Sequence, residues 1–463
     1  MTSALSDPVA VLDELRAALP GRVETDPGLL EAFTSDRSGH QSGGVPAAVV
    51  YPKSIDEVQT LCRIASSTGT PLVTRGAGTG LAGGAIAGPG EIALSTRDMD
   101  QIVEISPENR LAVVQPGILN GDLNRVLARQ GLWWAPDPAS RDISTVGGNI
   151  AMNAGGLLCA KYGVTREAVL ALKVVLADGR LISVGHRTVK GVTGYDLCAL
   201  MIGSEGTLGI IVECTLKLLP VVTGRIVTIG AFFGSVEDAA DAASAITKAG
   251  HVPAIMELMD DRTLEYVGRF TGEDLLGRGS AFLLVQCDGT DAGQTAQDVA
   301  DIVRSSGGIP ELTADPAASE RLVDLRRQAF PSLEAVGTLL VEDIAVPRDR
   351  MSEAFAAIRA LEKRYGLSIP TTCHAGDGNL HPTFAFQGDI VPEPVWAAAS
   401  ELFSLALELG GTLSGEHGIG LLKRRWLADE LGPDQFELQQ QIKAVFDPAN
   451  LLNPGKVFPP TNT

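Results

Sequence analysis

The chain has 463 residues, and 37 lysines and arginines against 56 aspartates and glutamates give it a formal net charge of −19. This length predicts about two to four domains, and 45% hydrophobic with 20% charged residues is typical of a folded globular protein rather than a disordered one. The acidic balance argues against nucleic-acid binding, because a phosphate backbone requires a basic stripe. The one basic cluster, residues 423–425, is expected on a solvated helix face.

No run approaches the ~18 uninterrupted apolar residues of a spanning helix, and residues 1–19 lack the basic start and apolar core of a secretory signal. We therefore expect a cytoplasmic protein with no transmembrane segment, and docking at the inner membrane face stays open. The six cysteines form no CxxC pair, which argues against the usual zinc and iron–sulfur frameworks. Most of them are expected to be small buried residues.

Hydrophobic spacing and capping residues predict helices over 8–19, from Ser54, over 120–130, from Ser235, over 295–306, near 349–364 and near 393–409. Alternating or continuous apolar runs predict strands over 47–51, 71–74, 111–115, 170–177, 180–184, 210–219, 226–233, 254–259 and 281–288. The character changes near residue 222, from a glycine-rich half to strands that alternate with helices. One further short helix and a proline-rich tail are expected after about residue 412.

Three glycine-rich loops carry the first functional signal, at residues 76–84, 147–156 and 203–206. The first fits GxGxxG, but the residues that follow it break a helix, which argues against a nicotinamide-binding Rossmann unit. Glycines let backbone N–H groups converge on a pyrophosphate, where Arg75 is suited to neutralise charge and Thr79 to donate a hydroxyl. A tight strand connection would explain one such loop, whereas three favour a cofactor site.

The motifs RGAGTGLAGG, PDPASRDISTVGGNIAMNAGG, TGYDLCALMIGSEGTLGII, HAGDGNLHP, SGEHGIG and NPGK occur in this order. Together they resemble flavoproteins of the vanillyl-alcohol oxidase type, in the branch of glycolate oxidase GlcD, D-lactate dehydrogenase and D-2-hydroxyglutarate dehydrogenase. The resemblance spans residues 45–457 and implies an α+β fold. Its parts are a two-part FAD-binding domain of the PCMH type, a ferredoxin-like α/β cap domain and a C-terminal helical segment. The corresponding boundaries are 1–44 for an N-terminal helical segment, 45–222 for the FAD domain, 223–411 for the substrate cap, and 412–463 for the segment completing the flavin and metal site.

The resemblance also implies which residues hold FAD. The first loop would wrap the pyrophosphate, the second would line the ribityl chain and isoalloxazine, the third would hold the adenine side and the isoalloxazine approach, and the C-terminal motif would return to the flavin. These residues are Arg75, Gly76, Ala77, Gly78, Thr79, Gly80, Gly83, Gly84, Pro136, Asp137, Ser140, Thr145, Gly147, Gly148, Asn149, Gly155, Gly156, Glu205, Gly206, Gly209, Ile210 and Asn453. The pyrophosphate loop contains no His or Cys, so we expect non-covalent FAD, with His40 as the remaining candidate for a tether.

Two short motifs hold three of the six histidines, namely His374, His381 and His417, the last beside Glu416. Two imidazoles and a carboxylate suit a divalent cation with open positions, and zinc, manganese and iron all fit such ligands. Histidines satisfied within a core are the alternative. The resemblance implies that His374, His381 and Glu416 are metal ligands and that His417 is the catalytic base.

Oxidation of a 2-hydroxy acid removes the hydroxyl proton and transfers the α-hydrogen as a hydride to the flavin. A divalent cation lowers the pKa of the hydroxyl, and an imidazole is suited to accept the proton. The substrate carboxylate favours a bidentate cation, for which Arg326 is the candidate and Arg327 the second choice. A surface salt bridge is the alternative for either arginine.

The expected substrate class follows from positions at which this chain differs from the 2-hydroxyglutarate enzymes of the branch it resembles. The 2-hydroxyglutarate enzymes carry Thr, Lys and Asn where this chain has Phe330, Val341 and Thr383. The loss of these partners would leave a second carboxylate unpaired, which is costly in a buried site. D-lactate or glycolate is therefore the expected substrate, with D-2-hydroxyglutarate as the alternative.

The expected partners are a small hydroxy acid and an electron acceptor, which is a quinone, a cytochrome, an electron-transfer flavoprotein or a separate iron–sulfur subunit. A homodimer is one option for the assembly. Two competing functions remain at this point. One is a metal-dependent hydrolase, which would not need three glycine loops, and the other is a non-catalytic FAD or metal-binding subunit of a larger complex.

Overall fold

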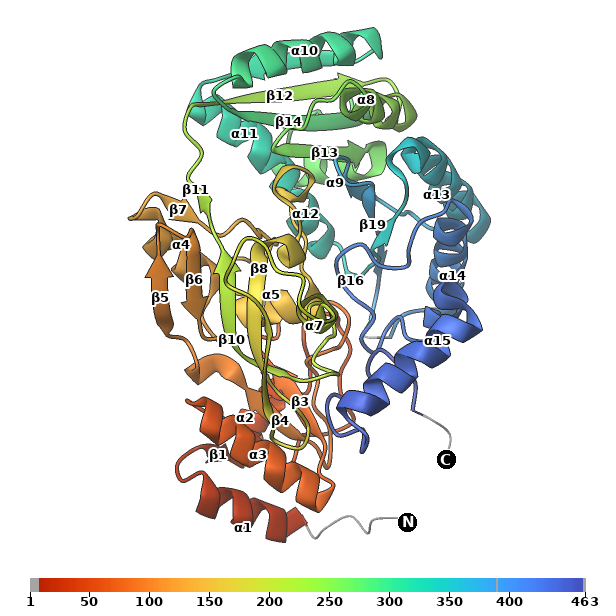
Figure 1. Cartoon of the computed structure of the whole chain (residues 1–463). Coiled ribbons are helices and arrows are strands. Elements are labelled where there is room, and N and C mark those ends of the chain that lie inside the picture. Colours follow the sequence, from red (N-terminus) through yellow and green to blue (C-terminus); the bar gives the residue numbers. More distant parts are fainter. Residues whose placement is uncertain (1–7, 389, 461–463) are drawn as a thin grey trace. The chain divides into compact units, whose positions relative to one another are not determined.

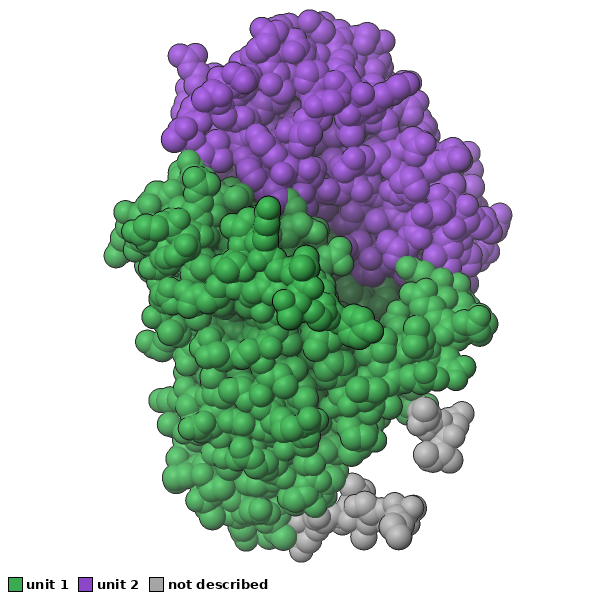
Figure 2. Space-filling view, viewed as in Figure 1, with its two compact units in different colours: residues 1–155, 163–221, 416–463 green, residues 156–162, 222–415 purple. Residues whose placement is uncertain are grey.

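The structure is a computed structural model that describes residues 8–388 and 390–460. The chain forms two compact units, coloured separately in Figure 2. Unit 1 comprises the chain up to residue 155, residues 163–221 and the chain from residue 416 on. Unit 2 comprises residues 156–162 and 222–415. Figure 1 labels most of the helices and strands of both units.

Unit 1 begins with a four-stranded sheet in the order β1–β2–β4–β3, in which β1 is antiparallel and the other pairs are parallel. The strands are β1 (Val23–Glu24), β2 (Ala48–Val50), β3 (Leu72–Arg75) and β4 (Ile92–Ser95). Helices α1 (Pro8–Ala18), α2 (Pro27–Leu30) and α3 (Ile55–Thr68) and the 3-10 turns η1 (Glu31–Phe33) and η2 (Thr96–Asp98) accompany it. One hydrophobic cluster joins α1 and α3 to the strands through Leu15, Leu61 and Ile92.

Helix α3 shows why its sequence folds in this way. The Ser54 hydroxyl accepts a hydrogen bond from the Glu57 amide at 3.2 Å, as the predicted capping pattern requires. The Glu57 carboxylate accepts from the Lys53 amide, one residue before the position of an ideal capping box. Gly69 ends the helix at φ +68°, a conformation that glycine adopts without a Cβ clash.

The second sheet of unit 1 is antiparallel, in the order β5–β6–β10–β8–β9. Its strands are β5 (Ile102–Ser106), β6 (Leu111–Val114), β8 (Val169–Val175), β9 (Leu181–Gly185) and β10 (Ile210–Lys217), and β7 (Leu132–Trp133) pairs with β11 (Leu219–Pro220) beside it. Helices α4 (Asn120–Ala128), α5 (Val146–Met152), α7 (Leu197–Met201) and the turn η3 (Thr165–Ala168) connect the strands. The predicted hairpin is confirmed as β8 and β9, joined at Gly179 with φ +84°.

The segment from residue 416 on completes unit 1. Its helix α15 (Leu427–Phe446) is broken at Gly432 and Pro433, so it is two helical pieces rather than the one short helix expected. Lys443 donates to the Thr207 carbonyl at 2.7 Å and also pairs with Asp447. Beyond the helix, the chain lies parallel to β3, because the Leu72 amide donates to the Leu451 carbonyl at 2.7 Å.

Unit 2 is built on one antiparallel sheet of eight strands in the order β15–β12–β14–β13–β18–β19–β16, with β17 also paired to β19. The strands are β12 (Arg225–Phe233), β13 (Ile255–Asp260), β14 (Ala281–Gly289), β15 (Ile309–Thr313), β16 (Thr338–Val341), β17 (Ile344–Ala345), β18 (Thr371–His374) and β19 (Asn379–Phe386).

Helices cover both faces of this sheet. They are α6 (Cys159–Tyr162), α8 (Val236–Lys248), α9 (Asp261–Thr271), α10 (Ala292–Ser305), α11 (Pro316–Arg327), α12 (Ala329–Glu334), α13 (Met351–Tyr365) and α14 (Glu393–Glu408), with the turn η4 (Arg348–Arg350). One cluster packs Leu264 of α9 and Val323 of α11 on Ile255 and Met259 of β13. Since alternate residues of a strand share a face, Glu257 lies on that same face of the sheet, under α9 and α11.

The α+β class is confirmed by these mixed sheets and helices. Five of the six cysteines are buried, as expected, and Cys159 is half-buried. The expectation of a solvated helix face at residues 423–425 is wrong. Lys423 lies in a turn before α15 rather than in a helix, and it is buried by packing, at 4% exposure. Across the described residues, no helix combines the length and the apolar character needed to cross a membrane.

Candidate functional site

The three glycine-rich loops meet within unit 1. A Cβ added at Gly76 in the first loop would lie 2.3 Å from the Thr145 hydroxyl in the second loop. The Gly203 and Glu205 amides of the third loop donate to the carbonyls of Ile150 and Ala151, at 3.0 and 2.9 Å. Loops far apart in the sequence are therefore packed together, and a side chain at position 76 would prevent the close approach of the first two loops.

Arg75 holds the first loop in place. Its guanidinium donates to the Ser35 carbonyl at 2.7 Å and the Ala85 carbonyl at 3.1 Å, and it lies 5.2 Å from the centre of the Phe33 ring. Burial lowers the pKa of Arg75, an effect opposed by the nearby Asp36. A Cβ at Gly78 would lie 2.1 Å from the Arg75 Nη2 atom, so glycine leaves the room that this side chain occupies.

Glu205 and Asn453 connect the loops to the C-terminal part of unit 1. The Glu205 carboxylate accepts from the amides of Ile419 and Gly420, at 2.7 and 2.8 Å. The Asn453 amide group donates to the Glu205 carbonyl at 2.6 Å and accepts from the Thr74 amide at 3.0 Å. Burial raises the pKa of Glu205, and the two amide hydrogen bonds oppose that rise. Both side chains thus fix backbone segments of the predicted flavin site.

The residues present fit a polar cofactor held by the backbone. Asn149 is 4% exposed, and its Nδ2 atom has no hydrogen-bond partner among the described residues. The Thr74 hydroxyl, also in unit 1, is buried and has no hydrogen-bond partner within the described part of the chain. Because buried polar groups in native proteins are nearly always satisfied, these two atoms are suited to a bound ligand. Ile210, by contrast, has its side chain in the hydrophobic cluster, which leaves only its backbone for such a contact.

The predicted FAD residues all belong to unit 1 except Gly156, which begins the 156–162 segment of unit 2. Several glycines among them are required by packing: a Cβ at Gly147 would lie 2.4 Å from the Pro116 Cβ atom, and one at Gly209 would lie 2.3 Å from Val174. Pro136 accepts a hydrogen bond from the Asn120 side chain at 2.8 Å. Asp137 is buried.

The first two metal-ligand candidates share one face of the sheet in unit 2. His374 ends β18 and His381 lies in the adjacent strand β19, where Thr372 pairs with His381 and His374 pairs with Asn379. This register places the two imidazoles diagonally, and their ring centres are 5.0 Å apart. Both side chains are nearly buried, at 7% and 8% exposure.

A buried carboxylate contacts the His374 imidazole. Glu257 of β13 is paired directly with His374 in the sheet, and its Oε1 atom lies 2.6 Å from His374 Nδ1. The other carboxylate oxygen, Oε2, accepts a hydrogen bond from Arg326 Nε at 3.0 Å and forms an ion pair with Arg326 Nη2 at 3.0 Å. Glu257 is 1% exposed, so this predicted substrate-binding arginine and a predicted metal ligand share one buried anion.

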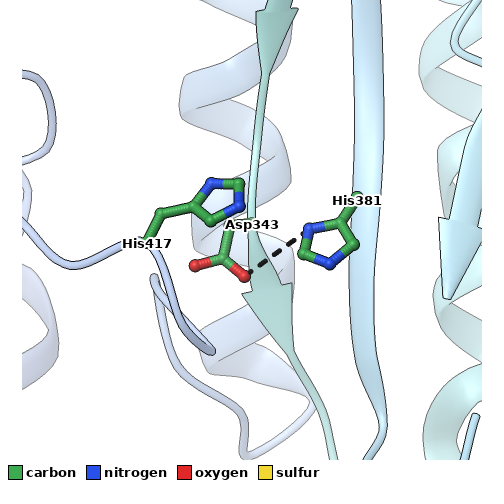
Figure 3. Close-up of side chains that lie close together, drawn as sticks. All are labelled: Asp343, His381 and His417. Atoms are coloured by element: carbon green, nitrogen blue, oxygen red, sulfur yellow. Dashed lines mark ion pairs between the residues drawn. The ribbon is translucent and has the colours of Figure 1, made fainter. Parts of the chain in front are cut away.

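A second buried carboxylate, Asp343, stands near His381. Figure 3 shows the pair, and the dashed line marks the 3.7 Å between Asp343 Oδ1 and His381 Nδ1. Asp343 also accepts from the Asn379 amide group and the Ser414 hydroxyl, each at 2.7 Å. The exposed fraction of Asp343 is 0%. The 412–415 segment is held here as well, because Thr412 and Ala345 exchange backbone hydrogen bonds.

Glu416 and His417 follow directly after Gly415 in the sequence and begin the last segment of unit 1. Two overlapping sets of side chains present ligand atoms within 4.8 Å of one another: His374, His381 and Glu416 form one, and Asp343, His381 and His417 form the other. Figure 3 draws the second set. The first set is the one that the sequence resemblance implies, and its chemistry of two imidazoles and one carboxylate suits a divalent cation.

Sequence reasoning missed Glu257 and passed over Asp343 as a ligand. The signal for Glu257 was a carboxylate in the otherwise apolar strand 254–259, since a buried charge needs partners. Arg326 was predicted, but its ion pair with Glu257 was not. Arg327 lies in α11 as well, but it pairs with Glu320 and Asp324 and is half-exposed.

Comparison with known families identifies the chain as an FAD-linked oxidoreductase. Residues 46–185 match the family described as FAD binding domain, and residues 224–457 match the family described as FAD linked oxidases, C-terminal domain. The chain belongs to this family of FAD-linked oxidases and is an enzyme.

Curated relatives cover most of the chain. Glycolate oxidase subunit GlcD of Bacillus subtilis is 39% identical over 90% of this chain and 90% of its own length. D-lactate dehydrogenase of Archaeoglobus fulgidus is 38% identical over 88% of this chain and 90% of its own length. Glycolate oxidase subunit GlcD of Escherichia coli is 35% identical over 98% and 92% of the two chains.

Solved structures agree on the fold. A 4-ethylphenol oxidase from Gulosibacter chungangensis superposes with a TM-score of 0.78 at 16% identity, covering 99% of both chains. A p-cresol methylhydroxylase superposes with a TM-score of 0.77 at 18% identity, covering 98% of this chain and 97% of its own. The FAD-binding fold of the PCMH type, predicted from the sequence, is confirmed by these neighbours and by the family matches.

Proposed function

We propose that this enzyme oxidises a D-2-hydroxy acid to the 2-oxo acid, with D-lactate or glycolate as its substrate. The observation that carries the proposal is the face of the unit 2 sheet on which His374, His381 and Arg326 gather, backed by the buried carboxylate of Glu257. The names of the relatives, glycolate oxidase and D-lactate dehydrogenase, support the same substrate class.

Each group has a proposed task. His374, His381 and Glu416 would hold a divalent cation, which would lower the pKa of the substrate hydroxyl, and bound FAD would supply the hydride acceptor. His417 accepts the hydroxyl proton. Arg326 binds the substrate carboxylate through Nη1 and Nη2, since Glu257 occupies its Nε and Nη2 edge.

The substrate preference rests on a pair of uncharged side chains. Val341 of β16 lies directly opposite Thr383 of β19, and Thr383 is two residues from His381 on the same face of the strand. Thr383 is buried, and its hydroxyl donates to the His381 carbonyl at 3.3 Å. This position offers no cation to a second carboxylate, which favours a monocarboxylate. D-2-hydroxyglutarate stays the alternative substrate. Phe330, which is 40% exposed, is the third position at which this chain differs from the 2-hydroxyglutarate enzymes.

The test is the visible spectrum of the purified protein, recorded without oxygen before and after D-lactate, glycolate or D-2-hydroxyglutarate is added. We expect one of the monocarboxylates to bleach the flavin band. His417→Ala should keep the flavin band but lose the bleaching, and Glu416→Ala should lose bound metal and activity together. His251→Ala is the control, because His251 lies in unit 2 outside these clusters. A flavin band that no acid bleaches in the metal-loaded protein would contradict the proposal and favour a non-catalytic FAD subunit.

The binding mode of FAD and the electron acceptor are parts of the same proposal. Non-covalent FAD predicts that acid precipitation of the protein leaves all of the flavin in solution, whereas a tether through His40 would leave it in the pellet. The sequence carries no iron–sulfur motif, so an iron–sulfur acceptor would have to be a separate subunit. Oxygen, a quinone, a cytochrome and an electron-transfer flavoprotein are the other candidate acceptors. The family assignment removes the support for a metal-dependent hydrolase.

A further inference from the structure

Glu257 contacts both a proposed metal ligand, His374, and the proposed carboxylate-binding arginine, Arg326. Its two oxygens are divided between them: Oε1 faces His374 Nδ1 at 2.6 Å, and Oε2 accepts from Arg326 at 3.0 Å. Both partners belong to unit 2, as Glu257 does. The register of the sheet fixes this geometry, because β13 and β18 pair Glu257 with His374.

We propose that Glu257 is a positioning residue that orients His374 for the divalent cation and Arg326 for the substrate carboxylate at the same time. The inference rests on the proposed function. It adds a residue that neither the sequence motifs nor the predicted ligand set contained.

The case for His374 is one of ring orientation. An imidazole whose Nδ1–H donates to a carboxylate is held in one tautomer, and its Nε2 lone pair is then the nitrogen available to a cation. The carboxylate also makes the imidazole a stronger donor to the metal. Because Glu257 is 1% exposed, water does not compete for this hydrogen bond.

The case for Arg326 is one of charge and fork geometry. Arg326 lies in the last turn of α11, and 15% of its side chain is exposed. A guanidinium in that position needs an anion when no substrate is bound, and Glu257 supplies it through the Nε and Nη2 edge. The planar guanidinium then presents its other edge in a fixed direction, so less conformational freedom is lost when a carboxylate binds.

A glutamine cannot replace Glu257 in both tasks. A carboxylate has two acceptor oxygens, whereas the amide has one acceptor and one donor group. Whichever way the amide turns, either His374 or Arg326 faces an NH2 group. Glu257→Gln is therefore nearly isosteric and still breaks the shared arrangement.

The experiment measures Zn²⁺ affinity of the FAD-loaded full chain, stripped with a chelator and titrated against a chromogenic chelator. In Glu257→Gln we expect Zn²⁺ to bind about 10- to 100-fold more weakly, the range found for such outer-sphere partners. The KM for the hydroxy acid that bleaches the flavin band should rise, and the flavin content should equal that of the wild type.

Asp260→Asn is the matched control. Asp260 lies on the same strand, is equally buried at 1% exposure, and pairs with an arginine, Arg359, at 3.2 Å. No histidine contact is part of that pair. We expect Asp260→Asn to lower the melting temperature yet leave Zn²⁺ affinity and KM as in the wild type. If it weakened both as much as Glu257→Gln does, the effect would be general softening of β13, and the proposal would be wrong.

A second comparison serves if Glu257→Gln does not fold. Arg326→Met leaves Glu257 with His374 alone, and the double variant Glu257→Met/Arg326→Met replaces both charges with apolar side chains, which buried pairs often tolerate. The double variant should bind Zn²⁺ about 10- to 100-fold more weakly than Arg326→Met. Equal affinities would overturn the proposal. Suppose the wild-type protein binds Zn²⁺ and its flavin is bleached by one of the acids, and Glu257→Gln has the same Zn²⁺ affinity and KM. The positioning role of Glu257 would then be wrong, and the proposed function would stand. If the wild-type protein neither binds Zn²⁺ nor is bleached by any of the acids, both the positioning role and the proposed function would be wrong.

Discussion

Glu205 and Gly420 lie 215 positions apart in the sequence, and the buried carboxylate of the first accepts a hydrogen bond from the amide of the second at 2.8 Å. The neighbouring Ile419 amide donates to the other carboxylate oxygen. Gly418, the residue after His417, has φ +84°, and a Cβ there would lie 2.9 Å from the Glu205 carboxylate. One side chain of the third glycine loop therefore fixes the backbone just beyond the proposed catalytic base.

The first prediction follows from this contact. Glu205→Gln keeps one acceptor where the structure uses two, so one buried amide loses its partner, at a cost of about 1–3 kcal/mol in the free energy of unfolding. Turnover should fall, because the segment after His417 loses an anchor. Denaturant unfolding and steady-state kinetics check this. Glu213→Gln is the control, since Glu213 is half-buried and pairs with Lys173 at the surface. Unchanged turnover in Glu205→Gln would contradict the anchoring role.

The second prediction concerns Gly155. A Cβ at this residue would lie 2.5 Å from Glu416 Oε2 and 3.1 Å from Glu416 Cβ. Gly155→Ala should therefore displace the Glu416 side chain and weaken Zn²⁺ binding, by about 10-fold or more if Glu416 is a ligand. Metal analysis after dialysis is the measurement.

The control for this variant is Gly293→Ala in α10. A Cβ at Gly293 meets no atom within 4 Å, so an alanine there has room and is favoured in a helix. Full Zn²⁺ binding in Gly155→Ala would argue against Glu416 as a ligand.

The third prediction tests the substrate preference. Val341→Lys with Thr383→Asn introduces polar partners at two facing positions beside His381. We expect the ratio of kcat/KM for D-2-hydroxyglutarate over D-lactate to rise about 10-fold or more, since a charge-assisted hydrogen bond contributes roughly 1.5–3 kcal/mol. Thr338→Lys, on the exposed start of the same strand, should leave the ratio unchanged. A wild-type enzyme that already prefers the dicarboxylate would contradict the argument.

The fourth prediction concerns pH and stability. Lys456 is 3% exposed and donates to the Ile86 carbonyl at 2.7 Å, and burial lowers its pKa from 10.5 to about 8. Between these two values the unfolded chain holds a proton that the folded chain has released, so the free energy of unfolding rises with pH in this window. The shift corresponds to roughly 3 kcal/mol.

Lys456→Met removes that contribution, so its unfolding free energy should gain less than the wild type between pH 8 and pH 10.5. Denaturant unfolding of the flavin-free protein across this range provides the comparison, with the exposed Lys217→Met as control. Parallel profiles for wild type and Lys456→Met would contradict the prediction.

Local sequence signals predicted the elements that are fixed locally. Ser54 and Ser235 cap helices as expected, because a cap depends on a hydroxyl and an amide three residues apart. The strands β15 to β19 and helices α11 and α12 were not predicted. Their apolar runs are short, and the long antiparallel sheet holds them through pairings that no local pattern records.

The sequence likewise predicted some residues of the candidate site but not the contacts between them. Motifs pointed to His374 and His381, but their approach depends on the register of β18 against β19. The contact of Glu257 with His374 joins residues 117 positions apart. Such a pairing is set by the order of strands in the sheet, which the spacing of residues along one chain does not contain.

Unit 2 is encoded almost entirely inside unit 1. A ribosome releases residues in order, and domains generally fold as they emerge. The sheet of unit 2 has all its strands once residue 386 is made. At that point β3 still lacks two of its hydrogen-bond partners, because the Leu72 amide donates to Leu451 and the Thr74 amide donates to Asn453. The half of the protein that begins first is thus completed last, because β3, the strand that leads into the first glycine loop, gains these hydrogen-bond partners only with the final stretch of chain.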